Sequence, residues 1–290
     1  MKHRSLLAGI SLLLAACTPR HSPAPSPLGA MPFAVDSVET EQIADGVTHT
    51  MIRSSAGPWT INVLSIRLDR CTTVEAVPGA GHPLGRERTS DLLAELAQGE
   101  RVLGGVNADF FNLRTGTPTN LLVASGAMRT PPIDQPVLAV DSAGIARVEF
   151  FSLVDGVLVP FHPLQAVGGR PVLVRDSMIA AEADTFGSAG FRGRNPRTAA
   201  GIARNGTRLI LATIDGRTPH DAGMTLRETA ALMLALGAPE AINLDGGGST
   251  TMVVADPDSA GRLRVVNHPS DKSGERAVGD ALAVVQRCGS

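Results

Sequence analysis

The sequence contains no tyrosine, and Trp59 is its one tryptophan. Aromatic residues make up only 3% of the chain, and the formal net charge is −2. Proteins that bind nucleic acids usually stack bases on aromatic side chains and carry a strong positive charge. We therefore expect no nucleic-acid partner. The same scarcity excludes a carbohydrate site built from stacked Trp and Tyr rings.

Several common catalytic patterns are also missing. There is no HExxH segment, the seven histidines are scattered, and there is no G-x-S-x-G segment. The segment from Asp256 to Gly261 begins like a calcium loop, but Asn267 occupies the position that requires Glu. We read this segment as an exposed hairpin turn. The sequence therefore predicts no metal site and no cofactor, although its Asp and Asn clusters leave a bound divalent cation as an alternative.

The composition is that of a folded protein. The chain has 290 residues, of which 43% are hydrophobic and 19% are charged, so it can bury a sizeable core. Its 31 glycines and 20 prolines predict many turns. No second linker interrupts residues 36–288, which we expect to form one domain.

The first 17 residues have the pattern of an export signal. Lys2 and Arg4 precede an apolar run that is too short to span a bilayer, and this run ends at Cys17. The pattern resembles a bacterial lipoprotein signal, in which the cysteine is lipidated after cleavage. Residues 18–35 are rich in Pro and Ser and suit a tether. We expect a protein anchored by lipid to the cell-envelope membrane, the alternative being an ordinary secretory signal cut after Ala16.

Two further cysteines, Cys71 and Cys288, remain in the predicted domain. In an oxidising compartment, two remaining cysteines predict a disulfide. Two free thiols are the alternative that the sequence leaves open.

Both strand and helix patterns occur along the chain. Residues 61–68 alternate like a strand, and residues 197–204 and 207–214 flank Asn205-Gly206, a two-residue hairpin signal. One helix should begin after Thr225, where Glu228 completes a capping box, and end at Gly237. An earlier helix should begin near Thr89 or Ser90 and end at Gly99. These elements predict an α+β domain with a central mixed β-sheet covered by a few helices.

The two predicted helices lead into similar segments. Each is followed by a glycine, a short apolar strand and an Asn-x-Asp sequence, formed by Asn107 with Asp109 and by Asn243 with Asp245. Side chains two positions apart on a strand share a face, so each strand end should present an amide beside a carboxylate. Coincidence in a chain rich in Gly and Leu is the alternative to a structural repeat.

A run of three glycines follows Asp245. Such a run indicates a positive φ or the close approach of a ligand, and its free N–H groups can bind an anion. No lysine follows as in a nucleotide-binding loop. A flexible surface turn is the alternative. The candidate substrate-binding residues here are Gly246, Gly247, Gly248, Ser249 and Thr250.

Further candidates lie elsewhere in the chain. Arg197 opens a predicted strand, and its guanidinium can bind phosphate or carboxylate in a bidentate manner. Thr198 and Asp215 are candidates for binding substrate, whereas Arg192 and Arg194 are expected at a solvated rim. Phe110 and Phe111 beside Asp109 are either a core pair or a pocket wall.

Taken in order, six segments resemble the phosphodiester glycosidase family. The resemblance covers about residues 100–286 and implies cleavage of a sugar 1-phosphodiester at the anomeric C–O bond, which leaves a phosphomonoester. The chain departs from the common family pattern at Asp109 and Asp280, which both add negative charge. The segments are GVNADFF, GGRPVLV, RNPRTAAGI, IDGR, AINLDGGGSTTMV and ERAVGDALAV.

This resemblance and the residue types together predict a hydrolase whose substrate is a phosphorylated glycan or sugar phosphodiester. Asp245 is the expected nucleophile or general base, and Asp109 a second acid/base. Arg197 and the glycine N–H groups should stabilise the departing phosphate. Asn107 and Asn243 should hold sugar hydroxyls or orient the carboxylates. The alternatives are an anionic-glycan-binding protein without catalysis and a phosphodiesterase that cuts the P–O bond.

Overall fold

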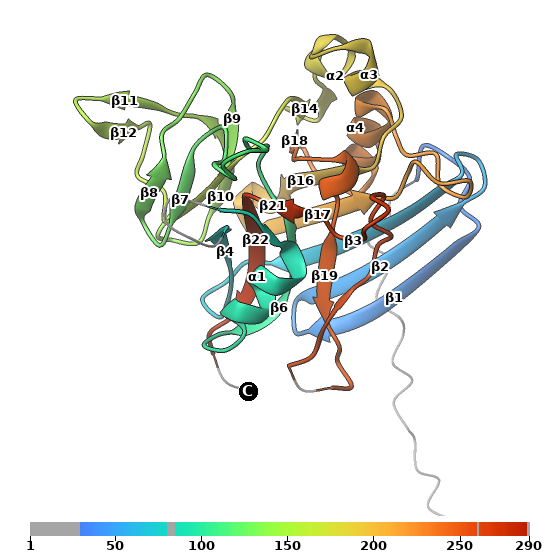
Figure 1. Ribbon diagram of the computed structural model, residues 1–290, viewed down its shortest axis with the longest axis horizontal. Coiled ribbons are helices and arrows are strands. Elements are labelled where there is room, and N and C mark those ends of the chain that lie inside the picture. Colours follow the sequence, from blue (N-terminus) through green and yellow to red (C-terminus); the bar gives the residue numbers. More distant parts are fainter. Residues whose placement is uncertain (1–29, 80–84, 260, 289–290) are drawn as a thin grey trace, which may run out of the picture.

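A computed structural model describes residues 30–79, 85–259 and 261–288 (Figure 1). The predicted signal with Cys17, and the tether before residue 30, lie outside the described residues. Met31 and Phe33, within the segment predicted as a tether, pack against the core, and the Phe33 ring lies 4.8 Å from the Trp59 ring. No helix of the described ranges is both long and apolar enough to cross a membrane.

The largest sheet has eight strands and forms one layer of the molecule. Its strand order is β1-β2-β3-β17-β16-β18-β14-β15. Helix α4 (Leu226–Ala235) covers one face of this sheet. The strands are β1 (Ser37–Ala44), β2 (Val47–Ser54), β3 (Trp59–Arg67), β14 (Val172–Arg175), β15 (Met178–Ile179), β16 (Arg197–Ala203), β17 (Arg208–Ile214) and β18 (Glu240–Asn243).

A five-stranded sheet in the order β20-β19-β6-β22-β4 packs against the other face of the large sheet. Helix α1 (Thr89–Leu96) covers its outer face. The strands are β4 (Thr72–Pro78), β6 (Arg101–Asn107), β19 (Met252–Ala255), β20 (Leu263–Val265) and β22 (Asp280–Gln286), and the short pair β5 (Glu87–Arg88) and β21 (Ala277–Val278) lies beside them.

A third sheet and a projecting hairpin lie at one side of the molecule (Figure 1). The sheet has the order β10-β9-β13-β7-β8, and the hairpin joins β11 to β12. The strands are β7 (Leu122–Ala124), β8 (Ala127–Thr130), β9 (Pro136–Val140), β10 (Ala146–Phe150), β11 (Ser152–Val154), β12 (Val157–Val159) and β13 (Gln165–Gly168). Two short helices, α2 (Glu182–Thr185) and α3 (Ala189–Arg192), precede β16.

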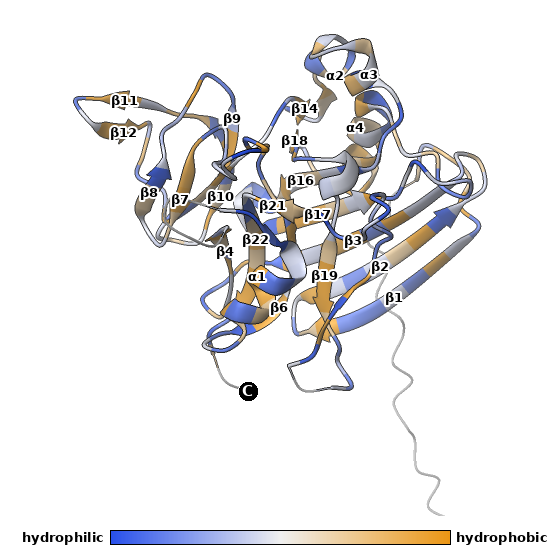
Figure 2. Ribbon diagram, in the orientation of Figure 1, coloured by the Kyte–Doolittle hydropathy of each residue, from blue (hydrophilic) through white to orange (hydrophobic). Residues whose placement is uncertain are grey.

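Alternating side chains explain how one strand serves two cores. On β17, Leu209 and Leu211 enter the core between the eight-stranded sheet and the sheet β20-β19-β6-β22-β4. Ile210 and Ala212 instead pack on the side covered by α4. On β22, Leu282 enters the same central core as Leu209. Because both faces of these strands are buried, their residues are mostly apolar (Figure 2).

The local predictions compare well with the structure. Strand β3 includes most of the predicted segment, and α4 has the complete Thr225–Glu228 capping box. Helix α1 begins at Thr89. The hairpin of β16 and β17 is present, but Ala203 pairs with Arg208, so its loop has four residues instead of the expected two. Arg204, Asn205 and Gly206 take positive φ in this loop.

A single α+β domain is consistent with the structure, but the predicted central mixed sheet is not confirmed. The protein is mostly β, with a few helices, and its strands form several sheets in which the pairings between described strands are antiparallel. The order of helices and strands in the sequence does not reveal this, because many of the paired strands are not consecutive in the chain. Strand β6, for example, pairs with β19 and β22.

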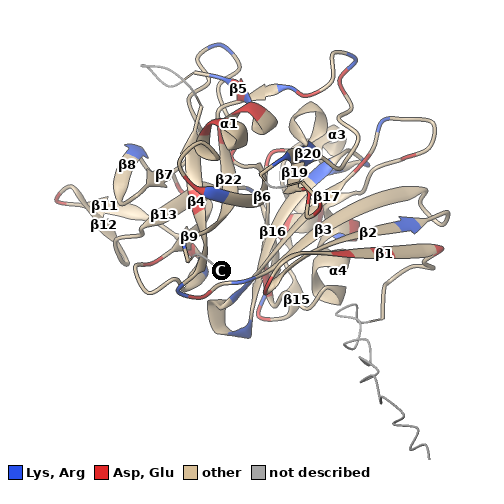
Figure 3. Cartoon of the chain, turned by 90° about the horizontal axis from the view of Figure 1, so that it is seen from below, with Lys and Arg blue, Asp and Glu red and all other residues tan. Residues whose placement is uncertain are grey.

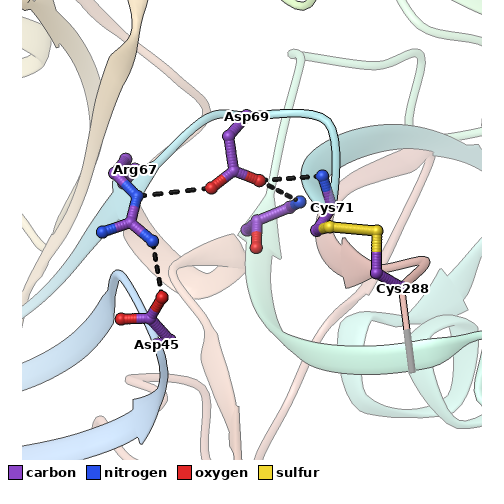
Figure 4. The surroundings of a disulfide bond; sticks show 6 residues. Asp45, Arg67, Asp69, Cys71 and Cys288 are labelled. Carbon is purple, nitrogen blue, oxygen red and sulfur yellow. Dashed lines mark hydrogen bonds and ion pairs between the residues drawn. A yellow bond between two sulfur atoms is a disulfide. The ribbon is translucent and has the colours of Figure 1, made fainter. Parts of the chain in front are cut away.

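The predicted disulfide joins Cys71 to Cys288, which are 217 residues apart (Figure 4). It ties the end of the chain after β22 to the turn before β4, the strand that pairs with β22. Asp69 organises this turn, since its Oδ1 accepts the N–H groups of Cys71 and Thr72, each at 2.8 Å. In the described part of the chain, acidic and basic residues are interspersed (Figure 3).

Candidate active site

A cavity of about 610 Å³ lies where several of the segments that resemble the phosphodiester glycosidase family come together. Its size is typical of small-molecule sites. Asp245 is the one carboxylate among its lining residues, which also include four arginines. The cavity is lined by Phe110, Arg170, Phe186, Gly187, Ser188, Gly190, Phe191, Asn195, Arg197, Arg217, Asp245, Gly246, Gly247, Gly248 and Arg276.

Asp245 follows β18 at the junction of the two large sheets. Its N–H donates to the carbonyl of Ala108 at 2.9 Å, and the Asn107 side chain donates to its carbonyl at 2.6 Å. Burial raises the pKa of Asp245 to about 6, although the Ser249 hydroxyl, Arg276, the Gly246 N–H and Arg170 act to lower it. At neutral pH this carboxylate is therefore mostly ionised but close to its titration range.

The glycine run lies close to two arginines, and several of its N–H groups form hydrogen bonds within the protein. The N–H groups of Gly247, Ser249 and Thr250 donate to backbone carbonyls, and the Gly246 N–H faces the Asp245 carboxylate. These four N–H groups are therefore used within the protein, whereas the Gly248 N–H takes part in none of these bonds. The glycines are needed for close packing, because a Cβ at Gly248 would collide with Arg276 and one at Gly247 would lie 3.1 Å from Arg217. Gly247 also has a φ of +63°.

Arg170 is positioned by Asn243. The Asn243 carbonyl accepts the Arg170 N–H at 2.7 Å, and the Asn243 side-chain amide donates to the Arg170 carbonyl at 2.8 Å. The Arg170 guanidinium lies 4.7 Å from the centre of the Phe110 ring. Asn243 is 1% exposed and is not among the residues that line the cavity, and in this geometry it holds the backbone of Arg170. Its expected role, to hold a sugar hydroxyl or to orient a carboxylate, stays a prediction.

Arg217 and Arg276 approach the glycine run from two other loops. Both Nε and Nη2 of Arg217 donate to Oδ1 of Asn195, at 3.3 and 2.9 Å. Arg217 has a φ of +61°, a strained conformation for a residue other than glycine. Arg276 forms a bidentate pair with Asp271, with N···O distances of 2.9 and 3.0 Å.

Arg197 lines the cavity but is only 2% exposed. Its Nε donates to the Met224 carbonyl at 2.9 Å, and its Nη2 donates to the carbonyls of Phe191 and Gly193 at 2.6 and 2.7 Å. The expected bidentate grip on a ligand through these two nitrogens is thus already taken by the backbone. Nη1 takes part in none of these bonds and remains for a ligand.

Three phenylalanines form an apolar wall of the cavity. Phe191 lies between the other two, with ring centres 5.9 Å from Phe110 and 5.8 Å from Phe186. Phe111 instead packs in the core under α1. Of the two readings of the Phe pair, the pocket wall therefore applies to Phe110 and the core to Phe111.

Asp109 lies outside the cavity wall and is 2% exposed. Its two carboxylate oxygens accept the N–H groups of Phe110 and Asn120, both at 2.7 Å, and its own N–H donates to Oδ1 of Asp280 at 2.8 Å. Burial raises the pKa of Asp109 to about 7. Burial and the neighbouring Asp109 raise the pKa of Asp280 well above its usual value. This placement favours support of Phe110 over direct acid/base contact with substrate.

The remaining candidates are buried around the site. Oδ1 of Asn107 accepts a hydrogen bond from the Thr198 hydroxyl at 2.8 Å, and this bond joins β6 to β16. Asp215 is 3% exposed and accepts the N–H of His268 at 3.0 Å, and burial raises its pKa to about 6. For the buried hydroxyl of Thr250, the described residues supply no hydrogen-bond partner. In the same described ranges, no group of three or more His, Cys, Asp or Glu side chains is placed to hold a metal ion.

The sequence profile of the phosphodiester glycosidase family matches residues 100–285, which include the cavity residues named above. The chain belongs to the phosphodiester glycosidase family. A Bos taurus N-acetylglucosamine-1-phosphodiester alpha-N-acetylglucosaminidase is 32% identical over 174 residues, which cover 51% of this chain and 30% of the relative. The chain thus spans less than a third of the length of this relative.

Two solved structures share the fold of this phosphodiester glycosidase family member. A hypothetical protein from Synechocystis has a TM-score of 0.66 at 17% identity, and the match covers 87% of this chain and 64% of that protein. The catalytic domain of the zebrafish N-acetylglucosamine-1-phosphodiester alpha-N-acetylglucosaminidase has a TM-score of 0.61 at 22% identity, with 89% and 87% covered.

Sequence reasoning missed three arginines of the cavity. Arg170, Arg217 and Arg276 were not among the predicted site residues, although each lies in one of the segments that resemble the family. The available signal was that GGRPVLV, IDGR and ERAVGDALAV each place one arginine beside a glycine or a turn.

Proposed function

We propose that the protein hydrolyses a sugar 1-phosphodiester at the bond between the anomeric carbon and oxygen, and releases the sugar and a phosphomonoester. The observation that carries this proposal is that the Asp245 carboxylate shares one cavity with four arginines. A carboxylate beside the anomeric carbon serves a transition state with oxocarbenium character, and guanidiniums serve the departing phosphate.

The chemistry needs only one carboxylate in contact with substrate. When the C–O bond breaks, its electron pair stays with the phosphate, whose charge changes from −1 to −2. A phosphomonoester has a second pKa of about 6, so it leaves without a strong acid. Arg170 and Arg276, whose charges act on Asp245, are placed to stabilise the added charge. Asp245 either attacks the anomeric carbon and forms an ester that water cleaves, or takes a proton from the attacking water.

We also propose that the protein is exported and lipid-anchored in the bacterial cell envelope. The export pattern ending at Cys17 supports this proposal, and so does the Cys71–Cys288 disulfide, a bond found mainly in oxidising compartments. The substrate would then be a phosphorylated glycan of the envelope.

The test is incubation of the purified protein with an N-acetylglucosamine 1-phosphodiester and measurement of free reducing sugar. We expect the wild type to release sugar and Asp245→Asn to be slower by about 1,000-fold or more. Asp258→Asn, at an exposed turn, is the matched control and should retain full activity. Release of no sugar would leave the alternative of a protein that binds anionic glycans without cleaving them.

Water labelled with heavy oxygen decides which bond breaks. Cleavage of C–O places the label in the sugar, whereas cleavage of P–O places it in the phosphate. Label in the phosphate would replace the glycosidase proposal with a phosphodiesterase.

A further inference from the structure

The charges of the cavity are not balanced. Among the described residues, no Asp or Glu oxygen lies within 4.0 Å of the Arg170, Arg197 or Arg217 guanidinium, whereas Arg276 is paired with Asp271. Asp245 and one bound phosphodiester each contribute a negative charge, so together with Asp271 they leave one of the four guanidinium charges unbalanced. Arg197 is 2% exposed, and a buried charge without a counter-ion is costly. Because the exposed Arg217 lines the same cavity, the pair indicates a ligand with more than one anionic group.

The four arginines fall into two sets. Arg170 and Arg276 act on the pKa of Asp245 and therefore lie near the reacting carboxylate. Arg197 and Arg217 act on each other, since burial and the Arg217 charge lower the pKa of Arg197 to about 10. The first set accounts for the phosphodiester, which leaves the second set without an anion.

Arg197 and Arg217 are held in a fixed relation by neutral groups. The Gly193 carbonyl accepts both Arg197 Nη2 at 2.7 Å and Asn195 Nδ2 at 3.1 Å. The Asn195 Oδ1 in turn accepts Arg217. The chain Arg197–Gly193–Asn195–Arg217 orients two guanidiniums without neutralising them. Their described hydrogen bonds use Nε and Nη2 of each, so Nη1 of each remains for a ligand.

We propose that Arg197 and Arg217 form a second anion subsite, so that the preferred substrate carries another negative group besides its phosphodiester. This inference rests on the proposed function and names its substrate class. The added group is a carboxylate or phosphate, which two guanidiniums recognise well. It belongs either to the sugar or to the alcohol of the leaving phosphate, and suitable ligands distinguish these two sources.

The test uses three ligands and the Asp245→Asn variant, in which turnover is expected to be about 1,000-fold slower, so that binding can be measured. The reference is N-acetylglucosamine 1-(methyl phosphate). The second ligand carries a carboxylate at C6 of the sugar, and the third is the 1-(2-carboxyethyl phosphate). By calorimetry we expect one of the two carboxylates to bind about 10-fold or more tighter than the reference, as for one added charge-assisted hydrogen bond.

Adding Arg217→Gln should reduce that preference to about twofold or less, whereas adding Arg194→Gln should preserve it. Arg194 pairs with Glu228 and lies outside the cavity wall, so it controls for loss of positive charge. Equal binding of all three ligands, or a preference that survives Arg217→Gln, overturns the subsite. Turnover by the wild type is scored separately: a preference without turnover refutes the proposed hydrolysis and keeps the subsite.

Discussion

The side-chain amide of Asn107 donates to the backbone carbonyl of Asp245 at 2.6 Å, although the two residues are 138 positions apart. Asn107 is fully buried, and its Oδ1 accepts both the Thr198 hydroxyl and the Thr251 N–H. The two Asn-x-Asp segments identified in the sequence are thus joined by a hydrogen bond. One of them holds the backbone of the carboxylate that the other supplies.

Asn107→Ala should therefore affect both stability and activity. The substitution leaves a buried carbonyl, hydroxyl and N–H without their partner, and we expect the free energy of unfolding to fall by about 2–4 kcal/mol. Urea denaturation measures this loss. The reaction rate of the folded fraction should also fall, because Asp245 loses its support. A stable variant with normal turnover would show that Asn107 does not position Asp245.

The pH dependence of hydrolysis should report the ionisation of Asp245. Its pKa is about 6, so the reactive carboxylate is lost as the pH falls below that value. We expect log(kcat/KM) to rise with a slope of about 1 up to pH 6 and to level off above it. Asp215 also has a pKa of about 6 but lies outside the cavity wall. The inflection in the pH profile should persist in Asp215→Asn. If it disappears in that variant, the inflection reports the ionisation of Asp215 and not that of Asp245.

Asp280→Asn should stabilise the protein at high pH. In the folded protein the pKa of Asp280 lies well above the unfolded value of 3.8, and that of the adjacent Asp109 is about 7. The folded state therefore retains protons that the unfolded chain releases, so stability is lost as the pH rises from about 4 through 7. We expect Asp280→Asn to raise the free energy of unfolding at pH 8 by about 1 kcal/mol or more.

Urea denaturation at pH 5 and pH 8 measures this effect. The difference between the two pH values should be smaller in Asp280→Asn than in the wild type, while Asp258→Asn, at an exposed turn, should leave it unchanged. An unchanged difference in Asp280→Asn contradicts a retained proton at this pair.

Local and distant interactions differ in how far the sequence predicted them. The Thr225–Glu228 capping box and the strand at residues 61–68 depend on neighbours in the chain, and both were predicted correctly. The separation into several antiparallel sheets depends on pairings such as β6 with β22, for which the chain offers no local signal.

The same difference applies to the site. Asp245 was predicted as a candidate because its strand and glycine run are contiguous, and it lies in the cavity. That Arg217 and Arg276 fill the space over the glycines was not visible, because their loops are remote from it in sequence. Nor could the sequence show that the Gly247 N–H is used by the Pro196 carbonyl, since this requires the partner of each donor to be known.

Gly248→Ala tests whether the glycine run serves the arginines. The added methyl group would collide with the Arg276 guanidinium and the Asp271 carboxylate, so this ion pair must shift. We expect kcat/KM to fall about 10- to 100-fold, as for a misplaced catalytic group. Gly99→Ala is the matched control, because no atom lies within 4 Å of the position that its added methyl group would take. Normal activity in Gly248→Ala would show that the position of Arg276 is unimportant.

Replacing both Cys71 and Cys288 by serine should lower the free energy of unfolding without changing the fold. The disulfide joins residues 217 positions apart and so removes much of the freedom of the unfolded chain. For a long loop the expected loss is about 2–5 kcal/mol. Urea denaturation of the double variant measures it, and reduced wild-type protein should show the same loss. If the oxidised, reduced and double-variant proteins unfold at the same urea concentration, the bond contributes nothing to stability.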